Sequence, residues 1–165
     1  MTNNNIEVMP AKETQKSVLR QLMELYCHDF SEFTGEDVDE HGLYGYSYLD
    51  YYWTEEDRYP FLIKVGGNIA GFALAKRTHD GKAYTIAEFF VMKKYRRMNV
   101  GGVAAKYLFD LFKGDWEVRV MQANKPAIPF WRRTIDEYTN GDFIYHPEFY
   151  LESDWDWIGY TFCSK

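Results

Sequence analysis

The stretch KKYRRMNVGG, residues 93–102, places four cations within five positions and ends in a pair of glycines. An apolar pattern with helical spacing begins at its end and continues to Phe112. A turn that leads into a helix exposes backbone N–H groups at the helix N-terminus, where the helix dipole also favours anions. Gly101 and Gly102 would let a ligand approach the backbone, and Asn99 tolerates a left-handed conformation. The pattern predicts a phosphate site, with a solvated basic turn as the alternative.

Other phosphate-binding classes fit the sequence less well. The loop G-x-x-x-x-G-K-[ST] and the dinucleotide fingerprint G-x-G-x-x-G are both absent. A nucleic-acid surface could use the same cations, but acidic regions on both sides argue against a broad phosphate footprint. We therefore expect no nucleic-acid partner.

Two further residues could do chemistry beside this site. Glu88 is the only charge in the apolar run AYTIAEFFVM, residues 83–92. A buried carboxylate is costly, so Glu88 should have either a partner or a raised pKa in a cleft. It could serve as a general base, with a structural ion pair or a solvent-facing edge position as the alternative. Asn124 follows the run WEVRVMQA, residues 116–123, and could cap the next helix.

The segment EFFVMKKYRRMNVGG, residues 88–102, resembles the GNAT superfamily of acyl-CoA N-acyltransferases. The family hallmark is a central strand, then [Q/R]-x-x-G-x-[G/A], then a helix. Arg96, Asn99 and Gly101 stand on the three defining positions, with Asn99 in place of the first glycine. A second family pattern, N-x-x-A-x-x-F-Y, is matched by Asn124, Ala127, Phe130 and Trp131. The resemblance is best over residues 61–133.

The resemblance implies that acetyl-CoA is the co-substrate. Its pyrophosphate would lie on the turn formed by Arg97, Met98, Asn99, Val100, Gly101 and Gly102, with Arg96 adding charge. The pantetheine arm would run along Phe90, Val91 and Met92 like an extra strand, and an N–H near Val91 would polarise the acetyl carbonyl. Asn124 would hold the pantetheine end or the thioester region, and Trp131 belongs to the same implied set.

The same resemblance implies an N-acetyltransferase that moves the acetyl group to a primary amine by direct attack in a ternary complex. Glu88 would be the base. Many family members have a tyrosine acid at the position of Trp131, which an indole cannot replace, so we expect Tyr138 in that role, with Tyr95 or solvent as alternatives. The competing interpretation is a non-catalytic acyl-CoA-binding sensor or interaction module of the same fold, which Trp131 and Asn99 would favour.

Periodicity predicts the elements that position these residues. Strands are expected at 6–9, 61–65, 69–77, 83–92 and 116–123, helices at 12–30, 48–53, 100–112 and 126–138, and a hairpin in the aromatic tail after residue 142. Gly66-Gly67-Asn68 reads as a hairpin turn. The expected fold is a single α/β (α+β) domain over 1–165, GNAT-like, with one mixed, mostly antiparallel central sheet and helices on both faces.

Charge is distributed unevenly along the chain. Residues 21–57 hold eleven Asp or Glu and no Lys or Arg, whereas residues 58–133 hold fifteen cations and five anions. The acidic region also holds many aromatic rings. The rings are Tyr44, Tyr46, Tyr48, Tyr51, Tyr52 and Trp53, and the carboxylates mixed with them include Asp29, Glu32, Asp37, Asp39, Glu40 and Asp50. Such a surface would suit a cationic small molecule or peptide amine. The alternative is that the rings are core and the carboxylates a solvated rim.

Composition sets the remaining expectations. The chain is 46% hydrophobic and 27% charged, as in a globular domain. Cys27 and Cys163 lie far apart, and the four histidines lack ligand spacing, so we expect no metal. Without a signal-peptide pattern or a transmembrane span, the expected location is the cytoplasm, with no membrane partner. The aromatic tail could complete the sheet or form an intersubunit strand, and a homodimer is possible.

Overall fold

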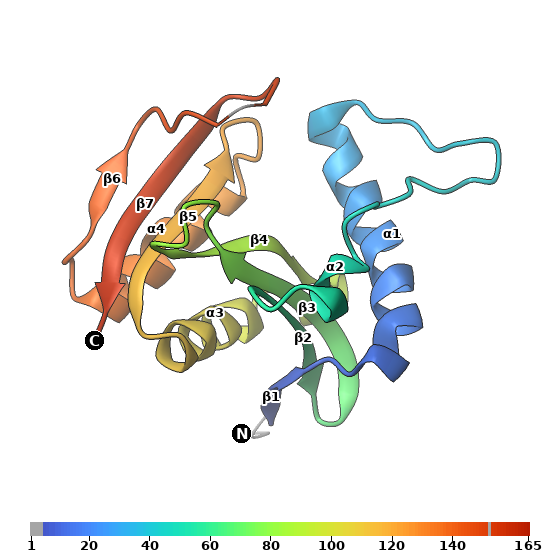
Figure 1. Ribbon diagram of the computed structural model, residues 1–165, viewed down its shortest axis with the longest axis horizontal. Coiled ribbons are helices and arrows are strands. Elements are labelled where there is room, and N and C mark those ends of the chain that lie inside the picture. The colour runs from blue at the N-terminus through green and yellow to red at the C-terminus, as the bar shows by residue number, and fades with distance from the viewer. Residues whose placement is uncertain (1–4, 152) are drawn as a thin grey trace.

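The computed structural model describes residues 5–151 and 153–165. Its strands are β1 (Ile6–Pro10), β2 (Arg58–Val65), β3 (Asn68–Arg77), β4 (Tyr84–Val91), β5 (Gly114–Met121), β6 (Ile144–His146) and β7 (Trp157–Ser164). Its helices are α1 (Lys16–Thr34), α2 (Tyr51–Thr54), α3 (Val100–Leu111) and α4 (Ala127–Thr139), with 3-10 turns at Glu13–Gln15 and Lys93–Tyr95. Figure 1 shows these elements around one sheet.

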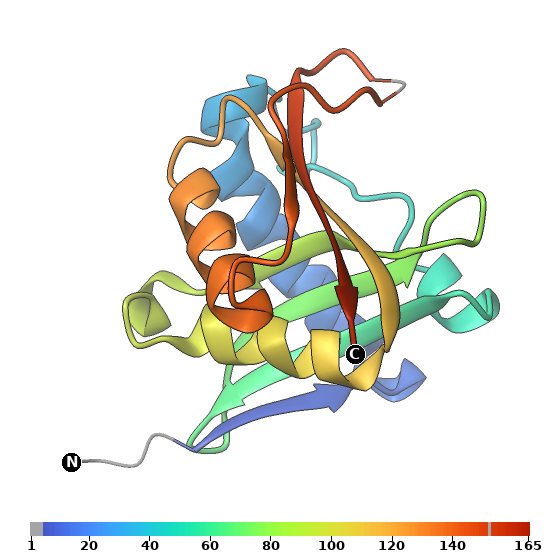
Figure 2. The ribbon, with the colours of Figure 1, turned by 90° about the vertical axis from the view of Figure 1, so that its left-hand side faces the viewer.

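The strands of the described residues form one sheet in the order β1-β2-β3-β4-β5-β7-β6. Neighbouring strands are antiparallel except for β4 and β5, which are parallel. One apolar cluster joins α1 and α2 to one face of the sheet, and another joins α3 and α4 to the opposite face (Figures 1 and 2). The predicted fold class, a mixed and mostly antiparallel sheet with helices on both faces, is confirmed.

Strands β4 and β5 separate almost as soon as they pair. Their register contains only Tyr84 with Trp116 and Thr85 with Glu117. Beyond Thr85, β4 is paired on its β3 side alone, up to Val91 opposite Gly71. The N–H of Met92 bonds to Ala70 on that side, at 2.8 Å. Because N–H directions alternate along an antiparallel ladder, the N–H of Val91 points to the open side.

Differences from the predicted boundaries have local causes. Helix α1 continues to Thr34, four residues past the predicted end, because Phe33 extends its apolar face and Gly35 then closes it in the left-handed region at φ 70°. The tail does form a hairpin, and β7 also pairs with β5 along its whole length. A homodimer stays a prediction. Among the helices of residues 5–151 and 153–165, none is long and apolar enough to cross a membrane.

Candidate active site

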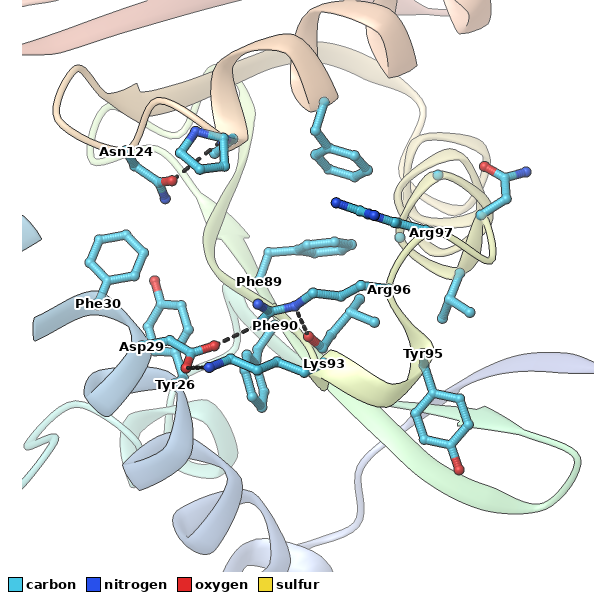
Figure 3. Close-up of a pocket in the computed structure, with 18 of the residues that line it drawn as sticks. Tyr26, Asp29, Phe30, Phe89, Phe90, Lys93, Tyr95, Arg96, Arg97 and Asn124 are labelled. Atoms are coloured by element: carbon cyan, nitrogen blue, oxygen red, sulfur yellow. Dashed lines mark hydrogen bonds and ion pairs between the residues drawn. The ribbon is translucent and has the colours of Figure 1, made fainter. Parts of the chain in front are cut away.

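A cleft of about 510 Å³ opens where β4 ends (Figure 3). Helix α1 borders one side, and the β4–α3 turn with the first turns of α3 and α4 borders the other. The wall includes Tyr26, Asp29, Phe89, Phe90, Val91, Arg96, Arg97, Asn99, Val100, Gly101, Gly102, Asn124, Phe130 and Arg133. The cleft therefore combines the open edge of β4 with two helix N-termini.

The start of α3 has the backbone that a bound anion would need. Asn99 is left-handed at φ 58°, as its residue type allows, and Arg97 also has a positive φ of 62°. A Cβ on Gly102 would lie 2.5 Å from Asn99 Oδ1, and one on Gly101 would lie 3.0 Å from the Phe130 ring. A side chain at either position would therefore need Asn99 or Phe130 to move, and the residues of the first helical turn border the cleft.

Asp29 crosses the cleft from α1 to hold two cations of the turn. Its carboxylate lies 2.5 Å from Arg96 Nη2 and 3.6 Å from Lys93 Nζ. Arg96 Nε also donates to the Val91 carbonyl at 2.8 Å. Arg96 therefore fixes the turn to β4 and to α1, as the dashed lines in Figure 3 show. Arg97 extends into the same cleft (Figure 3), and among the described residues no carboxylate lies within ion-pair distance of it.

A second cavity of about 390 Å³ lies on the α1 and α2 side of the sheet, around Glu88. Its wall contains Tyr46, Tyr48, Tyr52, Arg58, Lys76, Ile86, Ala87, Glu88, Arg119, Leu151 and Trp157. The partly buried Glu88 carboxylate accepts hydrogen bonds from Tyr26 at 2.5 Å and from Tyr46 at 3.2 Å. Loss of solvent raises the pKa of Glu88 to about 6, although both hydrogen bonds oppose that rise. Such a group is ionised at neutral pH and still basic enough to accept a proton.

The family model described as the acetyltransferase (GNAT) family matches residues 19–135. The chain belongs to this family. The N-acetyltransferase prediction is therefore confirmed at family level, and acetyl-CoA is the co-substrate that the family uses.

Solved acetyltransferases share the fold. One from Thermus thermophilus matches with a TM-score of 0.68 at 15% identity over 96% of each chain. A spermidine N-acetyltransferase from Vibrio cholerae, in complex with CoA and spermine, has a TM-score of 0.66 at 9% identity over 96% of this chain and 95% of that one. A putative streptothricin acetyltransferase from Bacillus anthracis, in complex with acetyl coenzyme A, has a TM-score of 0.52 at 18% identity over 70% of this chain and 68% of that one.

Most of the implied donor residues of this GNAT acetyltransferase border the cleft, but three do not. Met92 packs into the clusters beneath β4, and Met98 is 40% exposed outside the cleft wall. Trp131 is buried against Phe89, with ring centroids 5.0 Å apart. The preceding residue, Phe130, borders the cleft instead. One position on a helix is a rotation of about 100°, which is enough to exchange core and cleft.

Asn124 is placed for both of its predicted roles, as a helix cap and as a residue that contacts the ligand. Its Oδ1 accepts a hydrogen bond from the Ala127 N–H at 3.3 Å, which caps the start of α4, and the residue also borders the cleft. Capping and ligand contact are compatible because the amide nitrogen is a separate donor.

The structure does not bring Tyr138 to the cleft. Pro126, Ala127, Phe130 and Arg133 line it from the first two turns of α4, whereas Tyr138 is in the last turn. Its hydroxyl lies 2.9 Å from Asp110 Oδ1 and 2.8 Å from Ser164 Oγ, and its ring packs against Phe109. These contacts give Tyr138 a structural role away from the cleft wall, so the geometry does not support the predicted role as catalytic acid.

The rings and carboxylates of the acidic, aromatic region do not form the single surface that we expected for the acceptor site. Three of the six rings, Tyr46, Tyr48 and Tyr52, line the second cavity. None of the six carboxylates does: Asp29 and Glu32 border the donor cleft, Asp50 pairs with Lys16 and Arg20, and Asp39 binds N–H groups of its own loop. The rings therefore approach Glu88 without a surrounding cluster of acids.

Sequence reasoning did not predict which residues other elements bring to these cavities, and it assigned Asp29 to the acceptor surface and not to the donor cleft. Tyr26 and Asp29 stand three positions apart on α1, a spacing that shares one helix face, but nothing local indicates which element that face meets. Lys76 and Arg119 come from separate strands whose register is not visible in the sequence. In the described part of the chain, no group of three or more His, Cys, Asp or Glu is placed to hold a metal.

Proposed function

We propose that this protein transfers the acetyl group of acetyl-CoA to the primary amine of a small acceptor, by direct attack in a ternary complex. The observation that carries the proposal is Glu88. It is a carboxylate with a raised pKa on the strand whose open edge borders the donor cleft, and its side chain faces a second cavity. A donor and an acceptor would then meet across one strand.

The donor cleft fits acetyl-CoA. The N–H groups at the start of α3 and the cation Arg97 suit a pyrophosphate, and the left-handed Asn99 with Gly101 and Gly102 keeps side chains away from it. Val91 directs its N–H to the open edge of β4, where no strand of the described residues pairs with it, in the position of an oxyanion-hole donor. The bound thioester would supply the acetyl carbon that the amine attacks.

Glu88 is the proposed base. An amine must lose its proton before it attacks, and Glu88 can accept that proton directly or through water. Tyr26 and Tyr46 fix the orientation of the carboxylate by donating to its two oxygens. No Lys or Arg of the described chain lies within ion-pair distance of Glu88, so its charge remains available. This arrangement favours the enzyme over the non-catalytic acyl-CoA sensor.

The departing thiolate needs no tyrosine in this scheme. Tyr138 is held by Asp110, and the Tyr95 hydroxyl points away from the centre of the cleft (Figure 3). A CoA thiolate is a good leaving group, so we assign its protonation to solvent.

Two measurements test the proposal. Acetyl-CoA should raise the melting temperature more than ATP at equal concentration and ionic strength, because only a matched ligand gains from the cleft as well as from the charge. Thiol release with a panel of amines should then depend on the amine, and Glu88→Gln should lower kcat/KM by about 100-fold. If acetyl-CoA stabilises the protein but no amine is acetylated, the non-catalytic sensor becomes the better function. If ATP stabilises the protein as much as acetyl-CoA does, the proposed acyl-CoA site is wrong.

A further inference from the structure

Three strands bring cations to the second cavity, on the face where Glu88 lies. Arg58 of β2 is opposite Lys76 of β3, and Lys76 is opposite Thr85 of β4. Thr85 is opposite Glu117 of β5, and Arg119 follows two positions later on the same face. All three cations border the cavity.

Among the described residues, one of these three cations has an acidic partner. Arg58 Nε lies 2.5 Å from Glu55 Oε2. Within residues 5–151 and 153–165, no carboxylate lies within 4.0 Å of Lys76 or Arg119, and Arg119 Nη2 donates only to the Thr85 hydroxyl, at 3.2 Å. Both side chains are partly buried, and loss of solvent lowers the pKa of each. Arg58 and Arg119 add to this effect on Lys76, whereas Glu88 and Glu55 oppose it, and Glu117 opposes it for Arg119. Their charges would gain from a bound anion.

The same wall holds a polar atom without a partner. The Tyr52 hydroxyl is buried and makes no hydrogen bond with any described residue, and the side chain is 3% exposed. Buried hydroxyls nearly always have a partner, so this one is available to a polar ligand or to water in the cavity. It comes from α2 and lies beside Arg58, whose Cζ is 5.4 Å from the centroid of the Tyr52 ring.

We propose that the acceptor carries a carboxylate beside its amine, so that the second cavity binds an amino acid or a similar small zwitterion. Lys76 and Arg119 bind the carboxylate, and Glu88 faces the amine. Glu88 is opposite Leu74, two residues from Lys76 on β3, which is about 6.6 Å of strand, so one small molecule reaches both. The inference rests on the proposed function and narrows the expected cationic acceptor to one without a net positive charge in this cavity.

Matched acceptor pairs test the proposal, because each amino acid and its decarboxylated amine differ only in the carboxylate. Suitable pairs are tyrosine with tyramine, phenylalanine with 2-phenylethylamine, and tryptophan with tryptamine. We expect kcat/KM by thiol release to be higher for the amino acid by about tenfold or more, which corresponds to one charge-assisted hydrogen bond. Equal or faster transfer to the decarboxylated members would overturn the inference and leave the proposed function intact.

Binding separates the two failures. Calorimetry in the presence of CoA reports the acceptor site without turnover, so an amino acid that binds but is not acetylated contradicts only the proposed function. If no carboxylate-bearing member of the panel binds, the inference is wrong.

Variants locate the effect. Arg119→Gln and Lys76→Gln should each raise KM for the preferred amino acid by about tenfold, and should lower kcat/KM for its decarboxylated partner by a clearly smaller factor. Arg119→Lys should recover part of the loss. The matched control is Lys82→Gln, which removes a lysine whose side chain is 83% exposed in the β3–β4 turn. An equal loss for both members of a pair would show a structural role and overturn the assignment.

Discussion

Tyr26 donates a 2.5 Å hydrogen bond to Glu88, and this bond joins the two cavities of the protein. Tyr26 lines the donor cleft from α1, whereas Glu88 lines the second cavity from β4. A ligand that displaces the Tyr26 ring therefore changes a hydrogen bond that lowers the pKa of Glu88. Donor binding and the basicity of the proposed base are physically connected.

The pH dependence of activity should show Glu88 directly. Since the pKa of Glu88 is about 6, kcat/KM should fall as the pH drops through that value, when the carboxylate becomes protonated and can no longer accept a proton. The hydrogen bond from Tyr46 lowers the pKa of Glu88. Tyr46→Phe removes this bond, so the pKa of Glu88 should rise and the acidic limb of the pH–rate profile should move to higher pH. A pH–rate profile of both proteins and of Glu88→Gln checks this. If kcat/KM of Glu88→Gln still falls with a pKa of about 6, another group titrates there and the assignment to Glu88 is wrong.

Glu88 should also cost stability at neutral pH. Its pKa is about 6 in the folded protein against a usual 4.5, so the folded state binds the proton more tightly than the unfolded chain. The contribution of Glu88 to the free energy of unfolding is then largest below pH 4.5 and declines as the pH rises through about 6. Glu88→Gln should gain melting temperature relative to wild type across that window. A difference that does not vary with pH would contradict the raised pKa.

Tyr138→Phe should separate structure from catalysis. The change removes the hydroxyl that bonds Asp110, and we expect a loss of about 1 kcal/mol in the free energy of unfolding with kcat unchanged. Denaturant unfolding and steady-state kinetics on the same preparation measure both. A large fall in kcat at unchanged stability would restore Tyr138 as the acid.

Arg97 should contribute to donor affinity through its charge. Arg97→Gln removes a cation that extends into the cleft, and KM for acetyl-CoA should rise by about tenfold at low salt, less at high salt. Lys94→Gln is the control, since it removes an exposed cation three positions away that does not border the cleft. Equal effects of the two variants would indicate general charge attraction and no specific contact.

Asn99 should be replaceable by glycine. Its φ of 58° suits glycine at least as well, so Asn99→Gly should keep acetyl-CoA binding. Asn99→Val should lose about 1–2 kcal/mol or more of stability, because a β-branched side chain is strained in the left-handed region. Thermal unfolding with and without acetyl-CoA compares them. A valine variant as stable as the asparagine protein would show that the turn can change its conformation.

The local patterns predicted the sheet strands, the long helices and the glycine turn because each of these elements depends on residues that are consecutive in the sequence. The apolar period of 100–112 and the turn at Gly66-Gly67 both appear where the structure has them. The left-handed Asn99 followed from its residue type and position.

What could not be predicted depends on contacts between distant segments. Phe130 borders the cleft and Trp131 is buried because of the way α4 is rotated against β4. Asp29 pairs with Arg96, which lies 67 positions further along the sequence. Arg119 alternates with apolar residues in β5 as a solvent-facing residue would, although α2 and the β6–β7 segment enclose that face. Residue pattern gives a strand two faces and does not say what covers each of them.

The early separation of β4 from β5 leaves part of the sheet without its hydrogen-bonding partner strand. After Thr85, the central strand of the sheet has an edge inside the molecule, with hydrogen-bonding groups that face no partner strand. An outer edge can recruit another chain, but α1 and α4 border this one, so only a narrow and flexible molecule can add to it. Under the proposed function, acetyl-CoA takes the place of a missing strand. Amide deuterium uptake along Phe89–Val91 would then slow on binding, because the ligand finishes a sheet that the chain leaves open.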